Sequence, residues 1–176
     1  MRYSGCLRSD SQVITVHQSL NSYRKTTNHL EGGLLKMSKI AVVFWSGTGN
    51  TQAMADAVAE GAKEAGAEVS VFGPSEFNSN MVADFDSIAF GCPAMGAEVL
   101  EESEYDPMFT DVETALSGKK IALFGSYGWG DGQWMRDWED RCNAAGAKLV
   151  TEPVMANNTP GEDDLDQCKS LGRALA

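Results

Sequence analysis

Short apolar runs alternate with longer amphipathic stretches from residue 37 to the C-terminus. The short runs are rich in β-branched and aromatic residues, whereas the long stretches repeat apolar residues at helical spacing, as at Met54, Val58 and Ala62. Strands that alternate with helices in this way are typical of βα units, which build parallel sheets. The chain is therefore predicted to form an α/β fold, a doubly wound parallel sheet with helices on both faces.

Five strands and four longer helices can be placed on this pattern. The strands are predicted at residues 40–45, 68–72, 87–92, 120–126 and 147–154. The helices are predicted at residues 51–65, 106–116, 132–145 and 162–175, with a further short helix at 75–83. Most of the strands are continuous apolar runs, as expected of strands that are buried on both faces of a sheet.

The first 36 residues differ in kind from the rest of the chain. They are rich in Ser, Asn and Thr, have no sustained apolar period and carry a net charge of +3. We expect residues 1–36 to be a poorly ordered extension and residues 37–176 to be one domain. The extension has no apolar run long enough for a secretory signal or a membrane span. Met37 looks like a natural start, so an upstream start or an appended segment would account for the extension, with a targeting leader as the alternative.

Charge and cysteine content limit the partners and the compartment. The net charge is −11, so residues 37–176 carry −14. Long-range repulsion disfavours nucleic acid and anionic membranes as partners and favours basic proteins. Cys6, Cys92, Cys142 and Cys168 form neither a CxxC pair nor a dense disulfide pattern. This predicts free thiols and a cytoplasmic location.

A glycine-rich turn connects the first predicted strand to the first predicted helix. Its residues are Ser46, Gly47, Thr48, Gly49, Asn50 and Thr51. The glycines let backbone amides converge, the side chains add donors, and the helix N-terminus favours negative charge, so the turn is suited to an anion. No Lys or Arg occurs between Lys39 and Lys63, which favours a terminal phosphate monoester held by dipoles.

The sequence of this turn does not match two other phosphate-binding motifs. The Walker pattern lacks its lysine, and the dinucleotide pattern lacks its third glycine, where Gln52 stands. An ordinary glycine-rich turn with a Ser/Thr N-cap is the alternative for this stretch taken alone.

Two further unusual loops follow the third and fourth predicted strands. One contains Ala94, Met95, Gly96, Ala97 and Glu98, and the other contains Ser126, Tyr127, Gly128, Trp129, Gly130 and Asp131. In a doubly wound sheet these loops meet the glycine-rich turn at one edge. Trp129 and the polarizable Met95 are suited to cover opposite faces of a flat ring. The alternative is that each belongs to the core, the more frequent place for such side chains.

The three loops together resemble those of the flavodoxins, and within that family the short-chain branch. The resemblance rests on WSGTGNT at 45–51, AMGAEVLEES at 94–103 and GSYGWGDG at 125–132, and on their order and spacing. It implies a five-stranded sheet of strand order 2-1-3-4-5 that binds FMN without a covalent bond. It further implies an electron-transfer protein rather than an enzyme, a low-potential one-electron carrier that uses the oxidised, semiquinone and hydroquinone states of FMN.

The resemblance also implies roles for individual residues. Residues 46–51 would hold the FMN phosphate, Trp129 would stack on one face of the isoalloxazine ring, and Met95 would cover the other face. The backbone carbonyl of Gly96 would face flavin N5, and Glu98 would face the pyrimidine edge near N3.

Two further expectations concern the edges of this site. A type II turn at residues 95–98 would give Ala97 a positive φ when the Gly96 carbonyl faces N5. The resemblance also places residues 157–159 near the carbonyl end of the flavin.

Acidic residues are frequent after the second loop and beside Trp129. They are Glu98, Glu101, Glu102, Glu104, Asp106 and Asp131. Negative charge in the reduced flavin would be disfavoured beside them, which lowers the potential of the second reduction step. A solvated acidic face without redox consequence is the alternative.

Two other functions are weighed against an electron carrier. An FMN-dependent reductase of a small quinone-like substrate would need acid–base residues, but His17 and His29 both lie in the extension. Cys92 follows a buried strand and is expected to pack rather than to attack. A flavin-free binding module on the same fold is the third possibility. The carrier interpretation predicts a monomer whose partners are basic flavin- or iron–sulfur-containing oxidoreductases.

Overall fold

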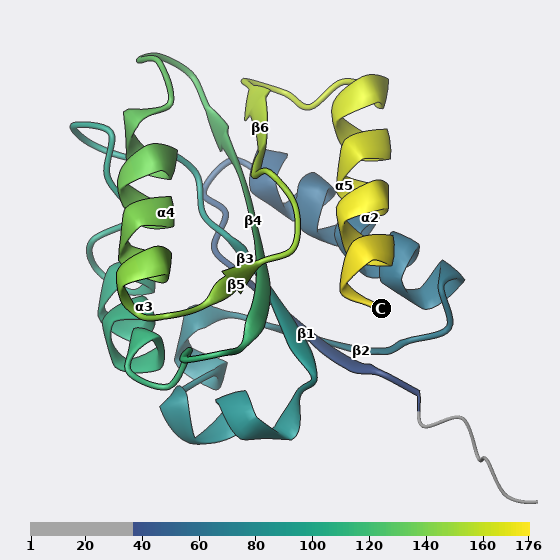
Figure 1. Ribbon diagram of the computed structural model, residues 1–176. Coiled ribbons are helices and arrows are strands. Elements are labelled where there is room, and N and C mark those ends of the chain that lie inside the picture. Colours follow the sequence, from purple (N-terminus) through teal and green to yellow (C-terminus); the bar gives the residue numbers. More distant parts are fainter. Residues whose placement is uncertain (1–36) are drawn as a thin grey trace, which may run out of the picture. The chain divides into compact units, whose positions relative to one another are not determined.

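A parallel β-sheet forms the centre of the computed structural model, which describes residues 37–176 (Figure 1). The predicted extension at residues 1–36 lies outside the described residues. The strands are β1 (Lys39–Phe44), β2 (Glu68–Phe72), β3 (Ser87–Gly91), β4 (Lys120–Tyr127), β5 (Lys148–Leu149) and β6 (Val154–Asn157). Their order is β2-β1-β3-β4-β5, and β6 pairs with β4. This confirms the predicted strand order and doubly wound class.

The predicted fifth strand at residues 147–154 is wrong in one respect, because it is two short strands. Leu149 pairs with Ile121, and the pairing resumes at Val154 opposite Phe124, so β5 and β6 both lie along β4. Pro153 stands in the gap and has no N–H with which to continue the ladder. The short helix predicted at 75–83 is instead two 3₁₀ helices, Pro74–Glu76 and Ser79–Asp84.

Within residues 37–176, four α-helices cover the two faces of the sheet. They are α2 (Asn50–Glu64), α3 (Tyr105–Glu113), α4 (Gln133–Ala144) and α5 (Glu162–Leu175). Alternate strand residues point to opposite faces, so Ile40 and Val42 pack with α2 and α5 while Ala41 and Val43 pack with α3 and α4. Figure 1 shows the two helix pairs on either side of the sheet. No helix within residues 37–176 is long and apolar enough to span a membrane.

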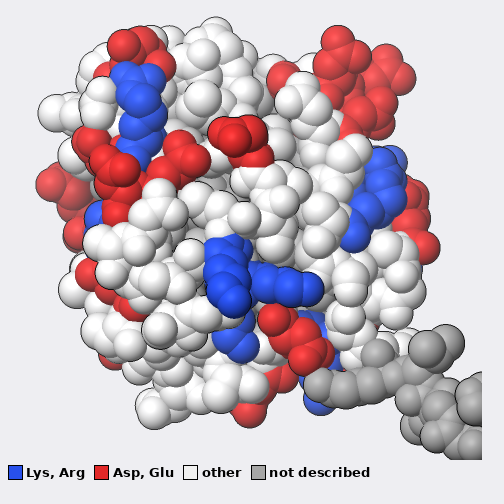
Figure 2. Space-filling model, viewed as in Figure 1, with Lys and Arg blue, Asp and Glu red and all other residues white. Residues whose placement is uncertain are grey.

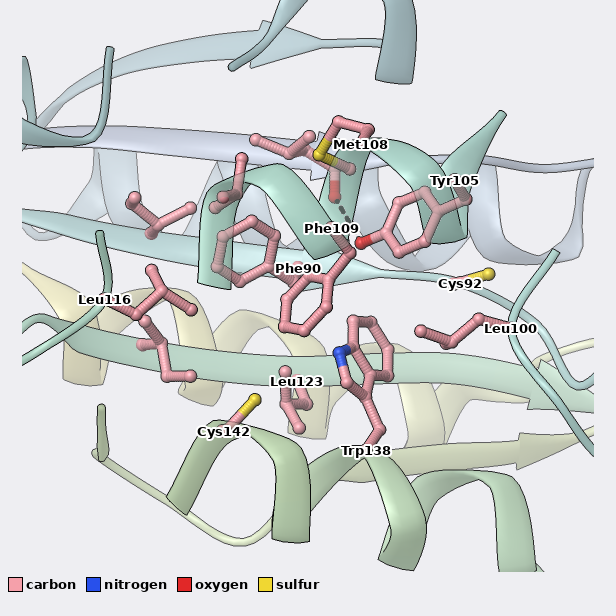
Figure 3. Packing of buried hydrophobic residues seen from close by; sticks show 14 of the residues in the cluster. Phe90, Cys92, Leu100, Tyr105, Met108, Phe109, Leu116, Leu123, Trp138 and Cys142 are labelled. Carbon is pink, nitrogen blue, oxygen red and sulfur yellow. Dashed lines mark hydrogen bonds between the residues drawn. The ribbon is translucent and has the colours of Figure 1, made fainter. Parts of the chain in front are cut away.

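The largest buried side chains of the core on the α3 and α4 face are aromatic, and four of them are labelled in Figure 3. The ring of Phe109 lies edge-on to Phe90 at 5.3 Å and to Trp138 at 5.4 Å between ring centroids. Such edge-to-face pairs add about 0.5–1.5 kcal/mol each beyond the burial of apolar area. Cys92 and Cys142 lie in the same cluster as buried free thiols, as predicted. Burial raises the pKa of the Cys142 thiol to about 12 and that of Cys92 still further, so neither is a nucleophile at neutral pH.

The start of α3 depends on a buried carboxylate. Glu101 accepts hydrogen bonds from the backbone amides of Ser103, Glu104 and Tyr105 at 2.9, 2.8 and 2.9 Å, and from the Ser103 hydroxyl. These amides would otherwise lack an acceptor at the helix N-terminus. Burial would raise the pKa of Glu101, but the hydrogen bonds outweigh burial and lower the pKa to about 2.

We expect Glu101→Gln to lower the free energy of unfolding by about 2 kcal/mol at pH 7, because an amide replaces an ionised acceptor. The folded-state pKa of about 2 lies below the ordinary value of 4.5. The carboxylate therefore contributes its full stabilisation above pH 4.5 and loses it as the pH falls toward 2. Urea unfolding of both proteins across this range should show the difference shrinking. The matched control is Glu102→Gln at the exposed neighbouring position, and an equal loss at pH 7 and pH 2 would contradict the prediction.

Candidate functional site

Backbone hydrogen bonds between neighbouring strands continue past the strand ends and bring three loops together. The N–H of Trp45 donates to the carbonyl of Gly91 at 3.0 Å, which aligns the ends of β1 and β3. The N–H of Ala94 donates to the carbonyl of Ser126 at 2.9 Å, which aligns the second loop with β4. The loops after β1, β3 and β4 therefore begin at the same edge of the sheet, as the strand order predicts.

A cavity of about 320 Å³ lies between these loops. The first loop contributes Gly47, Thr48 and Asn50, the second contributes Ala94 and Met95, and the third contributes Ser126, Tyr127 and Gly128. The other residues predicted from sequence belong to the same three loops but do not line this cavity: Ser46, Gly49, Thr51, Gly96, Ala97, Glu98, Trp129, Gly130 and Asp131.

Two lining residues, Trp45 and Pro93, have no role in the sequence predictions. Trp45 is the first residue of the motif at 45–51, and Pro93 directly precedes the motif at 94–103. Both could therefore have been included from the motifs alone. Asn158 belongs to the segment 157–159 that the resemblance places near the flavin. It follows β6 and reaches the cavity through the pairing of β6 with β4.

The glycine-rich turn has the backbone geometry of an anion site. Gly49 caps α2 in the left-handed conformation, with φ of 91°, and its N–H donates to Ser46 Oγ at 3.1 Å. The first three amides of α2 have no acceptor among residues 37–176. No side-chain oxygen caps the helix, so the ordinary Ser/Thr N-cap is wrong. Thr51 is buried, and its hydroxyl lies 3.2 Å from Ser126 Oγ, which joins the first loop to the third.

Met95 and Trp129 are exposed at the tips of the second and third loops. Their exposed fractions are 37% and 57%, so both belong to the few large apolar side chains that are exposed in the described part of the chain. The alternative that they belong to the core is therefore wrong. Single exposed apolar residues are common, but two on loops that flank one cavity indicate a surface that a ligand covers.

The second loop is a narrow turn with strain at an unexpected residue. Met95 and Val99 exchange two backbone hydrogen bonds of 2.8 and 3.0 Å across its base. Positive φ angles occur at Gly96 (48°) and Glu98 (55°), not at Ala97. The strained Ala97 expected from the type II turn is thus not present in this structure. Gly96 adopts its positive φ without a side-chain penalty. The positive φ of Glu98 is strained, so other contacts must offset its free-energy cost.

That compensation comes from the third loop. Glu98 Oε1 accepts hydrogen bonds from the backbone amides of Asp131, Gly132 and Gln133 at 3.2, 3.0 and 3.1 Å. The carboxylate thereby occupies the N-terminus of α4, where negative charge is favourable. Glu98 Oε2 makes no hydrogen bond to the described chain and is left as an acceptor. Gly130 has a φ of 86°, where a side chain is strained, and a Cβ there would also displace the Glu98 carboxylate, so this position favours glycine.

The acidic residues near the site are less free than the sequence suggests. Asp106 pairs with Arg141 at 2.5 Å, and Asp131 pairs with Arg136 at 2.6 Å. Glu101 is committed to the start of α3. The expectation that these acids act as free charges beside the flavin is therefore revised, because Arg141 and Arg136 pair with Asp106 and Asp131 and backbone amides hold Glu101.

Unpaired acids nevertheless remain at this edge of the sheet. Glu102 and Glu104 are exposed, and α5 begins with three consecutive acidic residues, Glu162, Asp163 and Asp164. In Figure 2 acidic side chains gather at the upper end of the view, where α4 and α5 present the ends that adjoin the loops. Lys120 and Lys148 instead face each other at the starts of β4 and β5, at the opposite edge. The edge that carries the cavity is therefore the more acidic one.

Comparisons with known proteins agree with this geometry. The family model for flavodoxin matches residues 42–172. A flavodoxin of Clostridium beijerinckii is 47% identical over 135 residues, covering 77% of this chain and 97% of that protein. A flavodoxin of Megasphaera elsdenii is 46% identical over 137 residues, covering 78% and 98%.

The fold agrees as well. The solution structure of two-electron reduced Megasphaera elsdenii flavodoxin matches with a TM-score of 0.72 at 46% identity, covering 77% of this chain and 97% of that one. Flavodoxins bind FMN and pass electrons between oxidoreductases, and they are not themselves enzymes. On its sequence, its fold and its three loops, this chain belongs to the flavodoxin family.

Proposed function

We propose that FMN binds in the cavity between the three loops and that the loop residues predicted from sequence hold it. The observation that carries the proposal is the group of unpaired amides at the start of α2, beside a cavity flanked by exposed Met95 and Trp129. The amides and hydroxyls of residues 46–51 would receive the phosphate. Met95 and Trp129 would cover the ring, and Glu98 Oε2 is a free acceptor for a ring N–H. FMN, when bound, supplies the one-electron redox chemistry.

The described residues explain how the chain would hold the flavin without reacting with it. The thiol nearest the second loop, Cys92, is fully buried and accepts the N–H of Glu101 at 3.4 Å. The loops supply dipoles and apolar cover rather than an acid–base pair. This composition suits a carrier, which must leave the flavin edge accessible to a partner protein.

We further propose that the chain is a cytoplasmic monomer whose partners are basic oxidoreductases. The acidic edge formed by Glu102, Glu104 and the first turn of α5 supports this choice of partner. Opposite charges steer the encounter of two proteins before contact. The buried free thiols support a reducing compartment. Membership of the short-chain branch stays a prediction.

Flavin selectivity tests the assignment of the phosphate loop. We expect the flavin-free full chain to bind FMN about 100-fold more tightly than riboflavin, because loss of the phosphate removes charge-assisted hydrogen bonds. FAD should also bind more weakly, since the loop suits a terminal phosphate. Titration of flavin fluorescence measures all three dissociation constants.

A variant pair makes this test specific to the loop. Asn50→Ala removes a side chain that lines the cavity at the start of α2 and should weaken the binding of FMN but not of riboflavin. Gln52→Ala, an exposed position outside the cavity lining, serves as the control. Equal losses for FMN and riboflavin in Asn50→Ala would show that the loop does not receive the phosphate.

Ionic strength tests the docking edge. With a basic c-type cytochrome as the electron acceptor, we expect the second-order rate to fall as salt rises from about 10 mM to about 150 mM, which shortens the Debye length from about 30 Å to about 8 Å. The double variant Glu102→Gln and Glu104→Gln should be slower and less salt-dependent than the wild type. Asp84→Asn, at the exposed residue before β3 on the opposite edge, is the matched control. A second-order rate that does not change with salt in stopped-flow measurements would show that the cytochrome docks on another surface.

A further inference from the structure

Asn158 stands where the last rung of the sheet meets the loop that carries Trp129. Asn157, the last residue of β6, is paired with Tyr127, the last residue of β4. The N–H of Asn158 then donates to the Tyr127 carbonyl at 2.7 Å. Tyr127 is followed at once by Gly128 and Trp129, so this bond holds the chain at the start of the third loop.

The backbone of Asn158 is held in an unusual conformation. Its φ is 61°, and within residues 37–176 only one other non-glycine residue, Glu98, has a positive φ. Asparagine tolerates the left-handed region better than most residues. This conformation places the side-chain amide of Asn158 beside the third loop. Asn158 Oδ1 would lie 3.2 Å from a Cβ built on Gly128, and Nδ2 donates to Asn157 Oδ1 at 2.8 Å.

The third loop has little rigidity of its own. Gly128, Gly130 and Gly132 alternate along it, and glycine leaves the backbone more freedom than any other residue. Glu98 fixes the end of this loop through the amides of residues 131–133. Asn158 touches its beginning, and Trp129 lies between these two contacts with 57% of its surface exposed.

We infer that Asn158 is a positioning residue for the flavin site: its side-chain amide supports Gly128 and thereby fixes where Trp129 stands. This inference rests on the proposed function, because Trp129 matters only if the three loops hold FMN. Tyr127, Gly128 and Asn158 all line the cavity, so a displaced loop start also changes the shape of the site. The support acts on the loop, and no reaction at Asn158 is required.

The substitution Asn158→Gly separates the side chain from the backbone conformation. Glycine accepts the positive φ without strain, so the urea midpoint of the flavin-free full chain should stay at the wild-type value. The dissociation constant for FMN should rise about tenfold, equivalent to about 1.4 kcal/mol. The visible circular dichroism of bound FMN should also change, because the stacking of Trp129 changes. Asn143→Ala, at an exposed asparagine near the end of α4 and outside the cavity lining, should alter none of these.

A double-mutant cycle tests the contact itself. Gly128 does not have a positive φ, so alanine is conformationally allowed there. Gly128→Ala should weaken FMN binding in the wild type, because its methyl group meets Asn158 Oδ1. In the Asn158→Gly background the same methyl has room, so its effect should be smaller or reversed.

The outcomes separate this inference from the proposed function. If the wild-type chain does not bind FMN, the proposed function fails. If the wild type binds FMN and Asn158→Gly binds it equally well, the inference alone fails. A lower urea midpoint with an unchanged dissociation constant would assign Asn158 a purely structural role and overturn the inference, as would additive effects in the cycle.

Discussion

The position of the site depends on the parallel ladder formed by β1, β3 and β4. These strands are neighbours in the sheet, and their hydrogen bonds continue into the loops, as in the bond from the Cys92 N–H to the Phe124 carbonyl at 3.1 Å. Ile88, Ala89 and Phe90 of the middle strand have no exposed surface. The bases of the loops are thus fixed by fully buried strands, whereas Met95 and Trp129, which are proposed to cover the flavin, lie at exposed tips.

Much of this arrangement follows from local sequence patterns. The strand runs, the helical periodicity and the Gly-rich turns are signals within a few residues of one another, so the element order and the three loops could be predicted. Contacts between distant residues could not. No residue near Glu98 in the sequence indicates that its carboxylate accepts hydrogen bonds from three backbone amides more than 30 positions away. The split of the fifth strand could have been read from Pro153. The resemblance places residues 157–159 near the flavin, but how Asn158 reaches the cavity follows only from the register of β6 on β4.

The distribution of acids shows why formal charge is a poor guide to the field at a site. Residues 37–176 carry −14, yet Asp106 and Asp131 are paired with arginines and Glu101 is surrounded by donors. Each of these charges is balanced within a few ångströms, and its effect at the cavity is correspondingly small. The cost of adding negative charge to the site is therefore lower than a count of acids implies, and backbone dipoles carry more of the control.

The exposure of Met95 and Trp129 has a consequence for the life of the protein in a cell. A ligand that binds only the folded state adds stability by mass action, about 4 kcal/mol when its concentration is 1,000 times its dissociation constant. If the flavin covers Met95 and Trp129 as proposed, a chain that lacks it presents two uncovered apolar tips and forgoes that stabilisation, which favours recognition by chaperones and proteases. The supply of flavin would then set how much of the carrier survives, independently of how much is synthesised.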